Sequence, residues 1–264
     1  IFEGKKLYKF NHKGEIEKEV ICSDAWILQN MGISERRYAR DDEEAHDMGE
    51  PALKKALQQS NLTHLEGIIV ATVTSERGFP STACEIQHLL NMSDTFAYDI
   101  AGACAGYLIG LMQADLAVRA GGYHTFGVVG VEKLSAMIDP RDANAPLFGD
   151  GAGASIVVSS QHLREHGLHK GALAGRIVAT HAVSNSNGDN LMAIYRDAQG
   201  YLRMPEGNKV MKFATRSMAE AVGVIKKKAG WSHDDIDLVI PHQANIRILE
   251  AVARASDLPR EKIY

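Results

Sequence analysis

Short runs of consecutive apolar residues alternate along the chain with segments whose apolar positions recur at helical spacing. The apolar runs predict strands at Gly67–Thr74, Phe96–Ile100, Thr125–Val131, Ala154–Ser159 and Asp237–Pro241. The periodic segments predict helices at Pro51–Gln59, Ser81–Leu90, Cys104–Ala120, Asn208–Lys228 and Gln243–Ala255. In the first of these helices a proline stands at the start, where it is best tolerated. Strands that alternate with helices in this way indicate an α/β architecture.

Two segments of the chain repeat one order of elements. The stretches that begin at Ala52 and Ala221 each run from a helix through a polar turn to an apolar strand, and another helix follows each strand. Two explanations of this repeated order remain open. One is an internal duplication, and the other is chance similarity between two generic strand–helix units.

Composition narrows the class of protein. The 264 residues include 29 Lys and Arg against 33 Asp and Glu, a net charge of -4 that argues against a nucleic-acid-binding protein. Three cysteines without paired spacing argue against a disulfide framework and favour a reducing compartment. No apolar run reaches the ~18 residues that a membrane span needs, and no signal-peptide pattern opens the chain. We therefore expect a cytoplasmic protein that contacts neither membrane nor nucleic acid.

Cys104 is the first candidate for chemistry. It lies in the sequence DIAGACAGY, between a predicted strand and a long apolar helix. A thiolate is favoured at a helix N-terminus, and a tight strand-to-helix turn presents a nucleophile. The alternative is a buried cysteine that packs as a small hydrophobic residue. Cys84 lacks the glycine-rich turn, and Cys22 has no evident activating group.

His242 is the second candidate, because it ends a predicted strand and precedes a helix. The carboxyl ends of strands in α/β sheets are where sites form, and histidine there acts as acid, base or hydrogen-bond donor. A capping or solvent-exposed histidine is the alternative. The histidines and cysteines show no HExxH or CxxC spacing, so we expect no metal site.

The segment Phe148–Ala154 (FGDGAGA) formally matches the dinucleotide-binding fingerprint. That fingerprint requires a helix directly after the glycines, whereas the residues that follow here predict a strand. A tight turn that brings the backbone close to an active site is therefore the better interpretation.

Five segments, taken together and in this order, resemble the β-ketoacyl-acyl-carrier-protein synthase III group of the thiolase superfamily. They are Ser23–Ala39, Gly78–Gln87, Asp99–Leu111, Phe148–Ala154 and Pro241–Ile248. The resemblance covers nearly the whole chain. It implies a thiolase-like fold of two similar βαβ-rich halves stacked in five layers (αβαβα). The N-terminal half, with the cysteine, would comprise residues 1–160, and the C-terminal half, with the histidine, residues 161–264.

The resemblance also implies an activity. Cys104 would take an acyl group from acyl-CoA or another acyl thioester, and a malonyl-acyl-carrier protein would then lose CO2. His242 would stabilise the resulting carbanion, whose attack on acyl-Cys104 yields a β-ketoacyl thioester and initiates fatty-acid synthesis. The backbone N–H of Cys104 would help to stabilise the oxyanion. Such an enzyme needs no cofactor or metal, and we expect a homodimer.

Substrate contacts carry over from the family by position. Trp26 would stack on the adenine of coenzyme A, although packing in the core is an alternative for this side chain. The acyl pocket would be lined by Phe79, Leu134 and Leu191, and the pantetheine tunnel by Phe148, Gly207 and Asn245. Positive charge for an acidic carrier protein would come from Lys212, Arg247 and Arg254, for which a solvated basic face is the alternative.

Some positions depart from the family pattern. Asn30 and Ala143 stand where arginines that bind coenzyme A are expected, and Arg141 could substitute for one of them. An extra residue lies within Met204–Lys212, and the family's catalytic asparagine is expected beyond Tyr264. We therefore expect an incomplete chain with impaired decarboxylation. A condensing enzyme of polyketide metabolism, an inactive thiolase-like partner subunit and a cysteine hydrolase remain alternatives.

Overall fold

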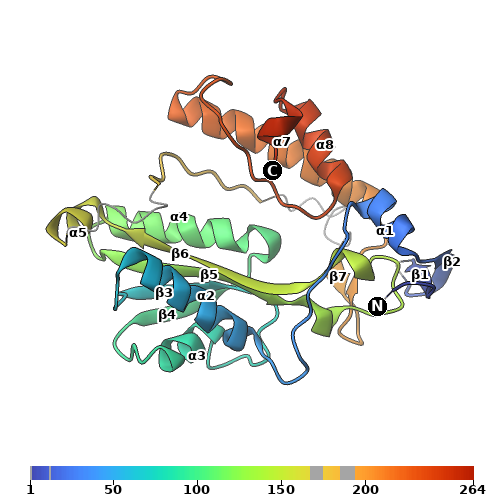
Figure 1. Cartoon of the computed structure of the whole chain (residues 1–264), viewed down its shortest axis with the longest axis horizontal. Coiled ribbons are helices and arrows are strands. Elements are labelled where there is room, and N and C mark those ends of the chain that lie inside the picture. The colour runs from blue at the N-terminus through green and yellow to red at the C-terminus, as the bar shows by residue number, and fades with distance from the viewer. Residues whose placement is uncertain (1, 12, 167–174, 185–193) are drawn as a thin grey trace. The chain divides into compact units, whose positions relative to one another are not determined.

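The computed structural model describes residues 2–11, 13–166, 175–184 and 194–264, and Figure 1 shows its helices and strands. Contacts group the chain into two compact units. Unit 1 comprises Ile1–Arg36, Met137–Gly149 and Val178–Tyr264, and unit 2 comprises Arg37–Ala136 and Asp150–Ile177. This grouping reflects contacts rather than repeated halves, so the predicted boundary after residue 160 stays a prediction.

Unit 2 is built on a four-stranded sheet in the order β4-β3-β5-β6. The strands are β3 (Gly67–Ala71), β4 (Phe96–Ile100), β5 (Thr125–Lys133) and β6 (Asp150–Val158). Strand β3 runs parallel to β4 and β5, and β6 pairs antiparallel with β5. All residues of β3 are buried, which explains why its sequence, GIIVA, shows no polar alternation.

Helices cover both faces of this sheet (Figure 1). Helices α2 (Ala45–Ser60) and α3 (Thr82–Leu89) pack on one face, and α4 (Gly106–Arg119) packs on the other. Successive side chains of β3 point to opposite faces, so Ile68 and Val70 join the core under α2 and α3, whereas Ile69 joins the core under α4. Full burial of each such side chain stabilises the fold by ~1.5–3 kcal/mol.

Unit 1 contains two hairpins and three helices among the residues described. The hairpins pair β1 (Lys6–Phe10) with β2 (Ile16–Ile21), and β7 (Tyr195–Arg196) with β8 (Leu202–Arg203). The helices are α1 (Asp24–Met31), α7 (Gly207–Ala229) and α8 (Ile246–Ala255). Unit 2 adds the short helix α5 (Ser160–Glu165). Short 3-10 helices are η1 (Ala103–Ala105), η2 (Leu134–Met137), η3 (Ala145–Leu147) and η4 (Arg260–Lys262).

A buried ion network holds part of unit 1 together. The guanidinium of Arg203, which is 6% exposed, contacts the carboxylates of Asp139, Asp142 and Asp197 at 3.2, 3.3 and 2.7 Å. The central guanidinium carbon of Arg203 also lies 4.3 Å from the ring centroid of Phe10. Because removal of one partner leaves uncompensated charge in the interior, this network fixes how the β7–β8 hairpin meets the segment around Asp139.

Two predicted elements differ from the structure. Helix α2 begins at Ala45, so the expectation that Pro51 starts the helix is wrong. The carboxylate of Asp47 accepts a hydrogen bond from the backbone N–H of Glu44 at 2.9 Å and secures the earlier start. The predicted strand Asp237–Pro241 is also wrong, because Val239 forms only an isolated bridge with Ile263.

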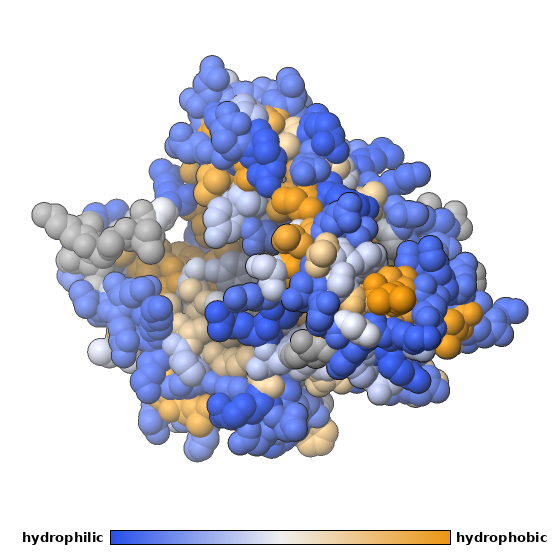
Figure 2. Space-filling view, turned by 45° about the vertical axis from the view of Figure 1, so that its right-hand side comes forward, coloured by the Kyte–Doolittle hydropathy of each residue, from blue (hydrophilic) through white to orange (hydrophobic). Residues whose placement is uncertain are grey.

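On the face that Figure 2 shows, hydrophilic residues predominate and hydrophobic residues form separate patches. Among the residues described, no helix combines the length and the apolar character that crossing a bilayer requires.

Candidate active site

Cys104 lies in a sharp turn between β4 and α4. Strand β4 ends at Ile100, η1 contains the cysteine, and α4 begins two residues after it. Ala103 has a φ of 44°, in the left-handed region that costs a non-glycine residue ~1–2 kcal/mol. Cys104 is a free and exposed cysteine. The predicted strand-to-helix turn is therefore present, and the alternative of a buried cysteine is wrong.

Glycines allow this turn to lie close against the sheet. A Cβ atom on Gly102 would lie 2.7 Å from the Cα atom of Gly106, and one on Gly106 would lie 3.0 Å from the Cβ atom of Ala71. Farther along α4, a Cβ atom on Gly110 would lie 2.8 Å from a methyl group of Val128. The small residues around the cysteine thus serve close packing of α4 on the sheet.

The electrostatic setting of the thiol differs from the expectation. Although part of the residue is exposed, desolvation by the surrounding protein raises the pKa of Cys104. A backbone N–H at the turn lowers this pKa, and the charge of Glu132 raises it. Desolvation outweighs the N–H contribution, so the net shift of this pKa is upward, opposite to the direction that a helix N-terminus favours.

Glu132 is a residue of this region that sequence reasoning missed. Its carboxylate accepts hydrogen bonds from the backbone N–H of Val73 at 3.0 Å and the hydroxyl of Thr74 at 2.8 Å. Burial nevertheless raises its pKa. A signal was present in the sequence, because Glu132 interrupts the apolar run of β5 close to the strand's carboxyl end.

The FGDGAGA segment is a strand rather than the predicted tight turn. Strand β6 begins at Asp150, and Gly151 and Gly153 pair with Glu132 and Gly130 of β5. The carboxylate of Asp150 fixes the start of the strand, because it accepts hydrogen bonds from the backbone N–H groups of Ala39 and Ser135, both at 2.8 Å. The glycines therefore lie in an antiparallel ladder next to Glu132.

His242 follows the Val239 bridge and precedes α8 in unit 1, whereas Cys104 belongs to unit 2. The residue keeps an exposed surface, but desolvation lowers the pKa of its imidazole. A lowered pKa favours the neutral ring at pH 7, and a neutral imidazole donates one hydrogen bond and accepts another. This form suits a hydrogen-bond donor to a developing enolate.

Three predicted binding residues meet through Asn30. The side chain of Asn245 caps α8 by accepting from the backbone N–H of Arg247 at 2.8 Å, and its amide donates to the carbonyl of Asn30 at 3.2 Å. Arg247 donates to the side-chain oxygen of Asn30 at 3.2 Å, and the amide of Asn30 donates to the carbonyl of Trp26 at 2.8 Å. Asn30, a departure from the family pattern, thus connects α1 to the start of α8.

Trp26 is half-buried. It packs against the core cluster around Leu7, Cys22 and Ile27. Part of the surface of Trp26 stays accessible, so this side chain can pack in the core and contact a ligand at the same time.

The remaining predicted residues fall at diverse positions. Phe79 is 88% exposed, whereas Leu134 and Phe148 are half-buried. Gly207 is the first residue of α7. Leu191 lies outside the described residues.

The predicted docking cations lie on α7 and α8. Lys212 lines a groove of about 590 Å³, together with Met211, Thr215, Arg216, Ala219, Glu220, Ala251 and Ala255. Arg254 lines a second, smaller groove with Glu250 and Asp257. All three predicted docking residues are exposed, but acidic side chains share both grooves, so positive charge is not concentrated there.

Comparison with known proteins identifies the family. The chain matches the model of 3-oxoacyl-acyl-carrier-protein (ACP) synthase III over residues 98–174 and the model of its C-terminal part over residues 227–264. It is 38% identical to a beta-ketoacyl-acyl-carrier-protein synthase III of Aquifex aeolicus, over 95% of this chain and 77% of that protein. With the synthase of the same name from Geobacillus kaustophilus it is 41% identical, over 94% and 76%.

The fold agrees with this relationship. The crystal structure of 3-oxoacyl-acyl-carrier-protein synthase III from Aquifex aeolicus superposes with a TM-score of 0.82 at 36% identity, over 100% of this chain and 80% of that one. The likeness confirms the predicted thiolase-like α/β fold. The identity over nearly the whole chain and the superposition together show that the chain belongs to the β-ketoacyl-acyl-carrier-protein synthase III family.

Proposed function

We propose that this chain catalyses a decarboxylating condensation in which Cys104 carries the acyl group and His242 stabilises the carbanion. Membership of the synthase III family supports condensation that initiates fatty-acid synthesis over the polyketide alternative. The observation that carries the residue assignment is the exposed thiol at the strained turn before α4.

The first half-reaction is acyl transfer to sulfur. The Sγ atom of Cys104 attacks the carbonyl carbon of an acyl thioester, a new S–C bond forms, and the donor's C–S bond breaks. The proton of Cys104 leaves with the released thiol. Because the pKa of Cys104 is raised, the fraction of reactive thiolate rises with pH over the range below that pKa.

The second half-reaction uses His242. The malonyl thioester loses CO2, and the electron pair of the broken C–C bond forms an enolate-like carbanion. A neutral His242 donates a hydrogen bond to the thioester oxygen, where negative charge develops. The carbanion then attacks the carbonyl carbon of acyl-Cys104, a C–C bond forms, and the C–S bond to Cys104 breaks. The Cys104 thiolate that leaves takes up a proton from solvent, which restores the thiol.

The substrates are part of the proposal. We assign acyl-CoA as the donor, with Trp26 stacked on its adenine, because the half-buried Trp26 keeps an accessible surface. We assign a malonyl-acyl-carrier protein as the acceptor, with Lys212, Arg247 and Arg254 as docking residues on α7 and α8. The reaction requires no cofactor or metal, since loss of CO2 drives it. A cytoplasmic homodimer is the proposed form.

Mass spectrometry after incubation with acetyl-CoA and longer acyl-CoAs tests the nucleophile. The expected result is one acyl adduct on Cys104 in the native chain and in Cys84→Ala, and none in Cys104→Ala. An adduct on Cys84, or a labelled Cys104→Ala chain, would contradict the assignment.

Decarboxylation of malonyl-acyl-carrier protein tests His242 separately. In His242→Ala, acylation of Cys104 should persist, whereas CO2 release should fall on the order of 100-fold, as after loss of one oxyanion donor. Equal loss of both steps would contradict this division of roles. A chain that acylates but never decarboxylates would instead support the alternative of an inactive partner subunit.

A further inference from the structure

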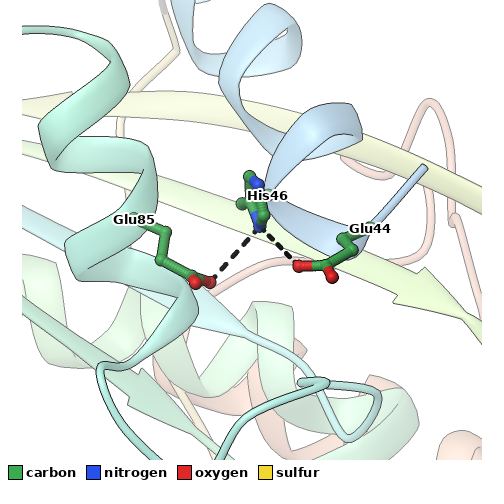
Figure 3. Close-up of side chains that lie close together, drawn as sticks. All are labelled: Glu44, His46 and Glu85. Atoms are coloured by element: carbon green, nitrogen blue, oxygen red, sulfur yellow. Dashed lines mark ion pairs between the residues drawn. The ribbon is translucent and has the colours of Figure 1, made fainter. Parts of the chain in front are cut away.

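A cluster of ligating side chains lies away from Cys104 and His242, where α2 begins and α3 passes. Figure 3 shows that Glu44 and His46, at the start of α2, and Glu85, on α3, point toward one another. One ligand atom from each residue lies within 4.8 Å of the other two. All three residues belong to unit 2.

The distances within the cluster exceed those of hydrogen bonds. The Nδ1 atom of His46 lies 3.4 Å from an oxygen of Glu44 and 3.3 Å from an oxygen of Glu85. Four ligands around zinc, with bonds of ~2.0–2.2 Å, lie ~3.3–3.6 Å apart along the edges of a tetrahedron. The two measured separations therefore match two edges of a zinc coordination sphere.

Two of the three ligand atoms also lack a hydrogen-bond partner. Among the residues described, the buried Nδ1 of His46 and the buried Oε2 of Glu44 have no hydrogen-bond partner. The side chains of His46 and Glu85 are 17% and 13% exposed, so water has limited access. A buried nitrogen facing two carboxylate oxygens without a hydrogen bond is costly unless a cation lies between them.

From these contacts we propose that Glu44, His46 and Glu85 bind a divalent transition-metal ion, with Zn²⁺ as the best match, and that a water completes the coordination. One imidazole nitrogen and two carboxylate oxygens are ligands that zinc accepts. The ion would connect the N-terminus of α2 to α3. It is a structural site, separate from the condensation reaction.

Arg77 competes for the same carboxylates. Its guanidinium lies 3.5 Å from Glu44 and 3.2 Å from Glu85, and its side chain is 56% exposed. The positive end of the α2 dipole lies nearby as well. An exposed arginine can move into solvent when the ion binds, so Arg77 should weaken zinc binding without preventing it.

No local sequence pattern indicates this site, because its ligands come from two helices and show no metal-binding spacing. Protonation of His46 is the competing explanation of the same contacts, since an imidazolium would also lie between two carboxylates. If only a proton occupies the site, added zinc should bind the native chain no more tightly than it binds His46→Gln. If the three residues bind zinc, the native chain should bind it more tightly, so a zinc titration separates the two explanations.

The test is calorimetric titration of the chelator-treated full chain with ZnCl2. His46→Gln and Glu85→Gln should bind Zn²⁺ on the order of 100-fold more weakly than the native chain. Two control variants should keep the native affinity: Glu50→Gln, whose side chain on α2 is 16% exposed, and His88→Gln on α3. Arg77→Gln should bind more tightly. Zinc should raise the melting temperature of the native chain but not of His46→Gln.

Cobalt distinguishes this site from cysteine ligation. Co²⁺ bound to the native chain should give visible bands of a tetrahedral nitrogen–oxygen site without the intense near-ultraviolet band of a cobalt–thiolate bond. Equal zinc affinity in the native chain, His46→Gln and Glu85→Gln would overturn the proposal. If those two variants fail to fold, the exposed Arg77→Gln decides, because unchanged or absent zinc binding in that variant would also overturn it.

Discussion

The segments that carry Cys104 and His242 are held in place in very different ways. The cysteine turn joins β4, which pairs with the fully buried strand β3, to a helix that touches the sheet through Gly106 and Gly110. The histidine follows a single bridge at Val239, flanked by Leu238 and Ile240, which are 51% and 67% exposed. The helix after the nucleophile is thus packed directly on a sheet, whereas the segment before the histidine is held by the two backbone hydrogen bonds of Val239 and by packing of its side chain on the cluster around Ile236.

This contrast suits the two roles. A nucleophile that receives the acyl group benefits from a fixed turn, because strain at Ala103 persists only when the surrounding structure determines it. The histidine is positioned from its other side by α8, whose first turn Asn245 caps and connects to α1. Substitutions that remove packing at one segment, or one hydrogen bond at the other, should separate the two contributions.

Among the substitutions that test this contrast, Gly106→Val should lower stability and acylation the most. The added carbon would lie 3.0 Å from the Cβ atom of Ala71, so α4 must move away from the sheet, at a cost of ~1–3 kcal/mol. We expect lower stability in chemical denaturation and loss of acylation at Cys104. Gly122→Val is the matched control, because a Cβ atom there meets nothing within 4 Å. Acylation at the native rate in Gly106→Val would contradict the close packing of the turn.

Val239→Pro addresses the histidine segment. Proline removes the N–H that donates to the carbonyl of Lys262 at 2.7 Å, a hydrogen bond worth ~0.5–1.5 kcal/mol. We expect decarboxylation to fall while Cys104 is still acylated, as judged by CO2 release and by adduct mass. Val239→Ala keeps the backbone donor and should keep most of the decarboxylation. An equal fall in both variants would assign the effect to the lost side chain instead.

Glu132→Gln tests the electrostatic part of the comparison. The carboxylate charge raises the pKa of Cys104, so its removal should lower this pKa and shift thiol alkylation to lower pH. Iodoacetamide rates measured against pH, with mass-spectrometric assignment to Cys104, give the direction of the shift. A shift to higher pH would show that loss of the hydrogen bonds to Val73 and Thr74 disturbs the turn more than the charge does.

The sequence predicted unit 2 better than unit 1, for a physical reason. Strand β4 has the bounds predicted for it. Strands β3 and β5 differ from the prediction only at their ends, because the uninterrupted apolar runs of these two strands mark buried strands. The run Asp237–Pro241 looks similar but forms one bridge, since pairing depends on partner strands that local sequence does not reveal. Sequence motifs also predicted the strand-to-helix turn at Cys104, which is present, whereas the catalytic roles of Cys104 and His242 stay predictions.

Other parts of the site depend on contacts between distant segments. Glu132 reaches Val73 and Thr74 through the pairing of β5 with β3, and the Asn30–Arg247 hydrogen bond joins two helices far apart in the chain. The raised pKa of Cys104 reflects how closely protein surrounds the sulfur, which a helix-terminus argument omits. Such properties follow from packing, and no local pattern encodes them.

Gly223→Ala should have the smallest effect, and it is opposite in sign to that of Gly106→Val. Gly223 lies within α7, is exposed, and would meet nothing within 4 Å if it carried a Cβ atom. Because glycine inside a helix is less favourable than alanine by ~0.5–1 kcal/mol, this substitution should stabilise unit 1 slightly. Chemical denaturation, followed with acylation and decarboxylation rates, gives the comparison. A loss of stability would mean that α7 packs more tightly around Gly223 than its exposure indicates.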